Sequence, residues 1–140
     1  MLKTSLIKRL EKFLKENEML GNPATSEQIA KAEKELNIKL PEEYVDFITR
    51  FGATYAGVDI YAFEEPENIV RLTLQAREAY KNDGRQEEAM RSVVISDDGA
   101  GNPILINGVG EVVVFYHDCD ERELLASSLN QLIENNFEEW

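Results

Sequence analysis

The sequence predicts a single α+β domain, in which a mainly antiparallel sheet of about four to five strands packs against helices. Three observations support this prediction. Most of the first half has helical periodicity, residues 93–117 hold three strand-like apolar runs separated by glycine-rich turns, and a helical pattern closes the chain. Such a succession of helices and strands is typical of the α+β class. A length of 140 residues suits one domain with one core, here residues 1–140.

The segment from Leu40 to Ala53 contains the clearest helix signal in the chain. Pro41 suits the first helical position, where its missing N–H costs nothing, and Gly52 suits the left-handed cap beyond the last turn. A helix of about three turns is not stable alone, so we expect its apolar face to be buried against a sheet. The residues that share this face at spacings of three and four are Tyr44, Val45, Phe47, Ile48 and Phe51.

Four further helices are expected from apolar periodicity and from helix-start signals. An opening helix places its leucines along one side. A second helix begins at the capping box formed by Thr25 and Gln28. A third runs from Ile69 to about Lys81 behind the capping residue Asn68, and Ser127 caps the closing helix.

Strand-like runs occupy the remaining apolar segments. The polar stretch 85–90 is expected to be a mobile loop or a fraying helical turn, and residues 136–140 a tail. The turns between the later strands are short and rich in glycine, which predicts hairpins, and the sheet is expected to be covered on one face. The expected strands are Val58–Ala62, Val93–Ile95, Ile104–Ile106, Val112–His117 and Glu123–Ala126.

The charge of the chain restricts its partners. Acidic residues number 27 and basic residues 15, so the net charge is −12, which repels nucleic acid and anionic membranes and attracts basic proteins. The alternative is that the acidity serves solubility alone. Cys119 is the single cysteine, so no internal disulfide forms and a reducing compartment fits. Lys8 and Arg9 interrupt the first apolar stretch, and the longest apolar run is too short to span a bilayer. We therefore expect a cytoplasmic protein.

The chain resembles the SUKH superfamily over roughly residues 25–133. The resemblance is carried by the spacing T-x-x-Q-I-x-x-x-E, the segment LNIKLPEEYVDFI, the pair FG, the later segment ISDDGAGNP and the closing ASSL. Asn37 stands where the family often has glycine, and Gly52-Ala53 replaces a more usual pair of glycines. The residues that match the family motif are Leu40, Pro41, Tyr44 and Phe47, which we interpret as framework rather than site.

The resemblance implies a fold and a class of function. The fold is an α+β domain with a mainly antiparallel sheet packed on helices. Bacterial members are mostly immunity proteins that bind and neutralise toxins, often nucleases, and fungal relatives regulate cell-wall assembly by binding other proteins. Neither role is enzymatic, and the binding surface varies among members, so the resemblance transfers no catalytic residue.

The only histidine and the only cysteine do not predict a catalytic dyad. His117 and Cys119 lie two positions apart, which would place them on one face of an intact strand. Asp118 is expected to start a turn between them, so the interpretation as a strand-end pair beside an acidic loop is preferred. No catalytic residue is predicted, because a nucleophile needs an activating base within reach.

No metal or cofactor is predicted either. Asp97, Asp98 and Asn102 carry oxygens that suit calcium, but their spacing does not match an EF-hand loop. Aspartate and glycine are also common in tight turns. Gly99 and Gly101 form a G-x-G that no helix follows, which is not a nucleotide-binding fingerprint.

Acidic residues gather in the turns at the expected strand ends, and tyrosines lie near them. If these turns converge, they would present a negative rim to a basic partner, and tyrosine is enriched in interface hot spots. The alternatives are solvated loops that do not converge and tyrosines that only pack against strands. The candidate partner-binding residues are Tyr55, Asp59, Tyr61, Glu64, Glu65, Asp97, Asp98, Asp118, Asp120 and Glu121.

Together these observations predict an immunity protein that binds a cognate polymorphic toxin through an acidic surface, with a basic nuclease domain as the expected target. A nuclease binds phosphate at a basic site, so an acidic rim would occlude that site. One alternative is a regulatory interaction domain of the same fold with a non-toxin partner. A second is a hydrolase or ligand-binding domain.

Overall fold

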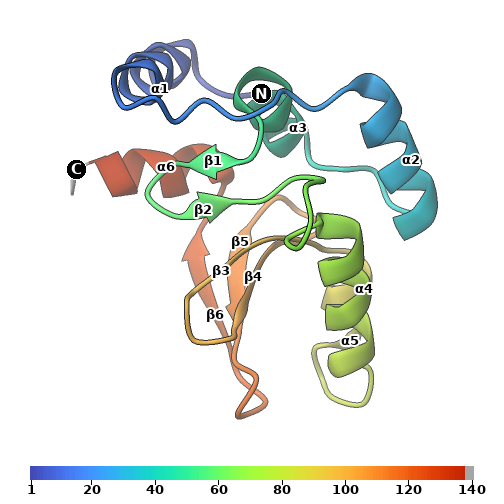
Figure 1. The fold of residues 1–140 in the computed structure, drawn as a ribbon. Coiled ribbons are helices and arrows are strands. Elements are labelled where there is room, and N and C mark those ends of the chain that lie inside the picture. The colour runs from blue at the N-terminus through green and yellow to red at the C-terminus, as the bar shows by residue number, and fades with distance from the viewer. Residues whose placement is uncertain (138–140) are drawn as a thin grey trace.

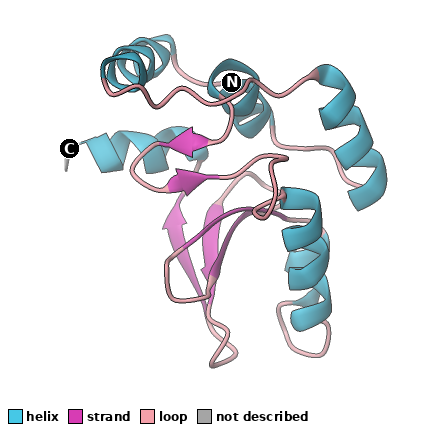
Figure 2. Ribbon diagram, in the orientation of Figure 1, coloured by secondary structure: helices cyan, strands magenta, loops and turns pink. Residues whose placement is uncertain are grey.

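The structure is a computed structural model and describes residues 1–137. Groups of helices and groups of strands follow one another in the order expected for an α+β domain (Figures 1 and 2). The elements are α1 (Thr4–Glu16), α2 (Ser26–Leu36), α3 (Glu42–Phe51), β1 (Thr54–Tyr55), β2 (Asp59–Ile60), α4 (Ile69–Ala79), α5 (Gln86–Met90), β3 (Val93–Asp97), β4 (Pro103–Ile106), β5 (Val112–Phe115), β6 (Arg122–Ala126) and α6 (Leu129–Phe137).

The main sheet is an antiparallel meander with the strand order β3-β4-β5-β6. Its register places Ile104 opposite Val114 and Val113 opposite Leu124, with an irregularity between β5 and β6 at Val112/Val113. The predicted hairpins are therefore confirmed, as is the short strand near Glu123–Ala126. The strand expected over 58–62 is only the two-residue β2, which pairs with β1 in a separate small sheet.

The main sheet is covered on both faces, so the expectation of cover on one face was wrong. Successive residues of a strand point to opposite faces, and here both sets are apolar. One set joins the larger core with α1, α2, α3 and α6. The other set, which includes Val94, Leu105, Val113 and Phe115, packs with residues of α4 and α5. All four residues of β5 are accordingly buried.

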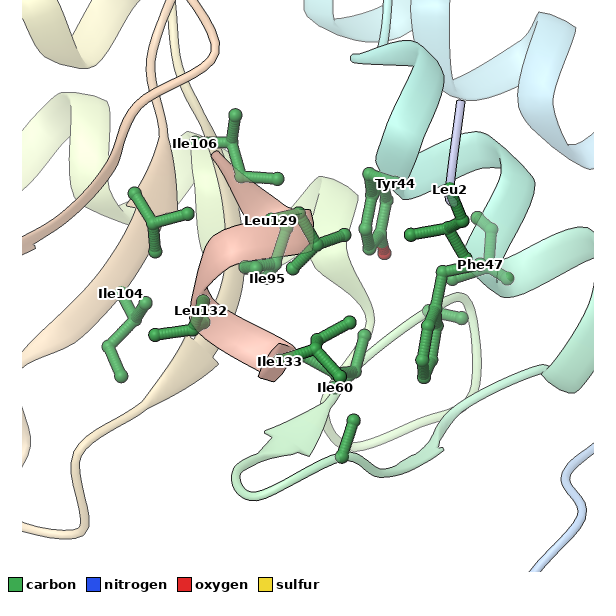
Figure 3. Close-up of a cluster of buried hydrophobic side chains, with 14 of the residues drawn as sticks. Leu2, Tyr44, Phe47, Ile60, Ile95, Ile104, Ile106, Leu129, Leu132 and Ile133 are labelled. Atoms are coloured by element: carbon green, nitrogen blue, oxygen red, sulfur yellow. The ribbon is translucent and has the colours of Figure 1, made fainter. Parts of the chain in front are cut away.

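The larger core confirms the predicted inner face of α3. Tyr44, Phe47, Ile48 and Phe51 are buried, whereas Val45 is half-buried. Figure 3 shows Phe47 and Tyr44 facing a cluster that includes Ile133 of α6 and sheet residues. Gly52 ends the helix at φ 71°, where an added Cβ would lie 2.4 Å from the carbonyl oxygen of Asn22. Glycine is therefore required at this position.

Most of the predicted helix caps are present. Thr25 and Gln28 form both bonds of the capping box, and Asn68 accepts a bond from the N–H of Val70. In addition, Asn37 ends α2 in the left-handed conformation. The cap of α6 lies one residue later than predicted, because the Ser128 hydroxyl, not that of Ser127, accepts from the N–H of Gln131.

Two segments differ in part from their predictions. Residues 86–90 form the short helix α5, so the helical-turn alternative holds rather than the mobile loop, and the preceding Arg85 is buried. Residues 136 and 137 continue α6 rather than starting a tail, and the rest of that expected tail lies outside the described residues. Within residues 1–137 no helix combines the length and the apolar character needed to cross a membrane.

Candidate partner-binding surface

Two acidic turns lie together at the end of the main sheet opposite α6 (Figure 1). One connects β3 to β4, and the other connects β5 to β6. The side-chain oxygen of Asn102 accepts a hydrogen bond from the main-chain N–H of His117 at 2.9 Å. The His117 ring nitrogen Nε2 lies 3.0 Å from the carbonyl oxygen of Ala100. These bonds hold the two turns side by side.

The β3–β4 turn is built around the Asp98 carboxylate. This group accepts hydrogen bonds from the N–H of Ala100 at 2.8 Å and from the N–H and side-chain amide of Asn102 at 3.1 and 2.8 Å. Asp97 accepts one bond, from the N–H of Gly99 at 2.6 Å. The bond from the Asn102 amide, followed by those from the main chain, lowers the pKa of Asp98 despite some desolvation. Asp98 thus shapes the turn as well as charging it.

The β5–β6 turn is held from beneath by Arg85. Its guanidinium donates to the carbonyl oxygens of Tyr116, Cys119 and Glu121 at 2.9, 2.8 and 2.7 Å. It also pairs with Asp83 at 2.9 Å. These bonds satisfy the carbonyl oxygens on the inner side of the turn. On its outer side, the carboxylates of Asp118, Asp120 and Glu121 are exposed to solvent.

Aromatic rings fix the position of the Arg85 guanidinium. Its central carbon lies 4.5 Å from the centre of the Tyr80 ring and 5.5 Å from that of Phe115. These two rings pack edge-to-face against each other at 5.1 Å. Cation–π contacts of this kind strengthen when they are desolvated, and the Arg85 side chain is only 6% exposed. The smaller core therefore orients the acidic turn.

Tyr61 lies beside a hollow of about 420 Å³ that also contacts Glu67, Asp97 and His117. The hollow runs between α4 and the β3–β4 hairpin. Partial burial is the main cause that raises the pKa of Tyr61, and the charges of Asp97, Asp59 and Glu67 raise it further. Tyr61 therefore sits among three carboxylates.

The main chain of Tyr61 is fixed by the core. Its N–H donates to the carbonyl oxygen of Ile95 at 2.8 Å. Its carbonyl oxygen accepts a hydrogen bond from the hydroxyl of Tyr44, whose pKa is raised by complete burial. The ring is thus presented from a rigid backbone at the edge of the hollow.

Seven of the ten predicted residues lie at this end of the molecule. We define the acidic end as the carboxylates of the two turns and those around Tyr61: Asp59, Glu67, Asp97, Asp98, Asp118, Asp120 and Glu121. With Tyr61 they make one surface, because Asp97 and Asp98 are adjacent and the turns are bonded through Asn102 and His117.

Three predicted residues are placed elsewhere. Tyr55, in β1, packs against the ring of Phe13, with ring centres 6.4 Å apart. Glu64 accepts a bond of 3.4 Å from the side-chain amide of Asn22. Glu65 forms an ion pair with Arg71 at 3.3 Å. The contacts named here lie outside the acidic end, although Tyr55 pairs with Asp59 across the small sheet.

Sequence reasoning missed the residues that organise this surface. Nothing in the pattern distinguishes Arg85 from an ordinary surface arginine, because its three carbonyl partners lie more than thirty positions away. Asn102 resembles any turn asparagine. Glu67 belongs to a predicted acidic turn but is not among the candidate residues, since local sequence does not show that it faces Tyr61.

The arrangement does not pair His117 with Cys119. Both side chains are exposed, and the histidine ring is directed to the carbonyl oxygen of Ala100. Among residues 1–137 no three histidine, cysteine, aspartate or glutamate side chains are grouped so as to hold a metal ion. What the site presents is exposed negative charge around a half-buried aromatic ring.

Comparison with known proteins identifies the class to which this α+β domain belongs. Residues 23–135 match the model of the SMI1 / KNR4 family (SUKH-1). The chain therefore belongs to this family, and the SUKH resemblance predicted from the motif segments is confirmed. Membership is consistent with a toxin-immunity or regulatory role. Comparison with curated proteins gave no match.

Proposed function

We propose that this protein is an immunity protein that binds and neutralises a cognate toxin, with a basic nuclease domain as its target. Membership of the SMI1 / KNR4 (SUKH-1) family supports the class of function. The observation that supports the mode of binding is the convergence of two acidic turns through Asn102 and His117. The proposed contact surface is the acidic end with Tyr61 at its edge.

The physical argument rests on charge complementarity. The active site of a nuclease is basic because it binds phosphate. Clustered carboxylates would therefore compete with the phosphates of the nucleic acid for that site. Exposed charges raise the association rate and set the orientation of encounter more than they add affinity. A half-buried tyrosine supplies the desolvated contact that slows dissociation. An interface of roughly 1,600 Å² would cover a nuclease cleft.

The proposed action is binding and not catalysis. In this arrangement the ring of His117 bonds to Ala100 rather than activating Cys119, and the proposal requires no cofactor or metal. We place the encounter in the cytoplasm, where the single cysteine of the chain would remain reduced.

A regulatory role with a non-toxin partner is the second candidate. The same family membership favours it, because SUKH relatives include regulators as well as immunity proteins. The two candidates share a binding surface and differ in what the partner does. Only an assay of the partner's own activity separates them.

The test begins with the tagged protein purified from its native host, followed by mass-spectrometric identification of what binds it. The partner is then purified alone, and its cleavage of DNA and RNA is measured with and without this chain. Inhibition at equimolar ratio is the expected result. A partner whose own toxic activity does not change on binding would support the regulatory role instead. The matched control is a charge-reversed variant of this chain, Asp118→Lys with Asp120→Lys.

A further inference from the structure

The main sheet has one covered edge, at β3, and one open edge, at β6. The outer edge of β3 is covered: its Ile95 carbonyl accepts from Tyr61, and its Val94 N–H donates to the hydroxyl of Thr73 at 2.9 Å. β6 is the other edge strand. Among residues 1–137, only β5 hydrogen-bonds to the main chain of Arg122–Ala126. An edge strand with unpaired groups is a template for another strand.

The register shows which groups of β6 face outward. Opposite residues of an antiparallel pair alternate between hydrogen-bonded and non-bonded pairs. The N–H of Tyr116 donates to the carbonyl oxygen of Glu121, directly opposite, so this is a bonded pair. Counting along the strand, Arg122 and Leu124 form non-bonded pairs with β5. Their N–H and C=O groups therefore point away from the sheet.

The side chains of β6 also suit a strand partner. Leu124 and Leu125 are 50% and 36% exposed, and they are the only large apolar residues of the described strands with such exposure. The charges of β6 are already engaged, because Arg122 bonds to both carboxylate oxygens of Glu88 and Glu123 accepts from the hydroxyl of Tyr116. What remains free is two exposed leucines beside open backbone.

We propose that β6 receives an extended basic segment of a partner protein as a fifth strand of the main sheet. The turn that leads into β6 carries Asp118, Asp120 and Glu121, all exposed, so lysine or arginine in the added strand would lie near opposite charge. This mode is β-augmentation, in which main-chain bonds supply affinity and side chains supply specificity. The inference rests on the proposed function only for the identity of the partner.

A second copy of this chain fits the edge less well. Each copy carries a net charge of −12, and the turn next to β6 concentrates part of that charge. Pairing two copies would bring like-charged surfaces together, which opposes association. The occupant we propose is therefore basic and belongs to a different protein.

The probe is a short peptide, capped at both ends, that alternates lysine with valine. Its binding to the full-length protein is followed by NMR, through amide shifts and hydrogen exchange of β6. We expect protection of the outward N–H groups of Arg122 and Leu124 and weaker binding as salt rises. Two control peptides keep the length: one replaces lysine by glutamate, and one carries N-methyl groups on every residue so that both bonding edges are blocked. Equal binding of the N-methylated peptide would overturn the proposal.

Variants of the protein locate the contact. Leu124→Pro removes an outward N–H without removing a bond to β5, a position at which proline is tolerated in an edge strand. Leu124→Thr keeps that N–H and removes the apolar side chain. We expect Leu124→Pro to weaken peptide binding about fivefold or more beyond the effect of Leu124→Thr, as loss of one net hydrogen bond predicts. Indistinguishable affinities of the two variants, both folded, would overturn the proposal.

The same variants separate this inference from the proposed function. If the co-purified partner is a toxin that Leu124→Pro still binds and inhibits normally, the immunity role stands and the β6 contact is wrong. If the partner has no toxic activity but loses affinity for Leu124→Pro, the β6 contact stands and the immunity role is wrong. The peptide experiment decides the edge contact even when no partner is recovered.

Discussion

The side chain of Asn102 accepts a hydrogen bond from the N–H of His117 at 2.9 Å, and this bond joins the two acidic turns. Its amide group donates to Asp98 at 2.8 Å, so one buried side chain bonds to both turns.

We expect Asn102→Ala to lower the free energy of unfolding by about 1–3 kcal/mol, because a main-chain N–H loses its acceptor. Urea denaturation measures this. Asp118→Asn, in the exposed part of the second turn, should change stability little, and equal effects of the two variants would contradict the linking role.

Asp98 should make stability depend on acid pH. Its hydrogen bonds lower its pKa in the folded protein below the ordinary value of 3.8. The carboxylate therefore stabilises the fold at pH values above 3.8, and this contribution is lost as the pH falls through the lower folded pKa. Urea midpoints measured from neutral pH to about pH 3 should fall more steeply for the parent than for Asp98→Asn. Asp118→Asn controls for the loss of one negative charge, and parallel curves for the parent and Asp98→Asn would show that the Asp98 bonds do not matter.

Arg85 should be needed for the order of the β5–β6 turn. Arg85→Ala removes the donor for three carbonyl oxygens and leaves Asp83 unpaired, so we expect a loss of about 2–4 kcal/mol in unfolding free energy. Hydrogen exchange in residues 116–121 should accelerate before global unfolding. Arg91→Ala is the matched control, because its ion pair with Glu87 is exposed and such pairs contribute about 0–1 kcal/mol. Unchanged exchange in the turn would contradict the role assigned to Arg85.

Phe47 should be among the most costly core truncations. Its side chain is fully buried and packs edge-to-face against Phe51, with ring centres 5.3 Å apart. We expect Phe47→Ala to cost about 3–5 kcal/mol, a large part of the roughly 5–15 kcal/mol that stabilises a typical domain. Val45→Ala, on the half-buried side of the same helix, should cost clearly less. A melting temperature unchanged by Phe47→Ala would mean that the inner face of α3 is misassigned.

Charge reversal should divide the predicted carboxylates into two groups. Asp118→Lys and Asp120→Lys, at the acidic end, should each lower the association rate with the co-purified partner several-fold, and added salt should reproduce the effect because it screens exposed charge. Glu64→Lys should have a smaller effect, since Glu64 faces Asn22. Surface plasmon resonance across a salt series measures both rates. An association rate that is independent of salt and of all three reversals would leave the acidic end with no role in binding.

In the same experiment, Tyr61→Ala should raise the dissociation rate of the complex. Its ring is half-buried at the hollow, whereas its fold-supporting bonds come from the main chain, so truncation should leave the fold intact. Loss of a desolvated aromatic contact mainly raises the dissociation rate. Tyr55→Ala, on the small sheet, is the matched aromatic control.

Much of the fold was predictable because its signals are local. The inner face of α3 follows from helical spacing, the capping box of α2 from two residues three positions apart, and the meander from short turns between apolar runs. The error about the covered faces of the sheet came from judging cover by helix order alone. The unbroken apolar run of β5 is itself typical of a strand buried on both faces.

The sequence by itself determined the α+β class, the family motif, the acidity of the strand-end turns and the identity of the main core residues. Only the tertiary structure decided which acidic residues share a surface. Glu64 and Asp97 are equally plausible in sequence, yet one faces Asn22 and the other lies beside Tyr61. The physical reason is that convergence depends on long-range bonds, those of Asn102 to His117 and of Arg85 to the β5–β6 turn. Their partners are chosen by the packed sheet rather than by neighbouring residues.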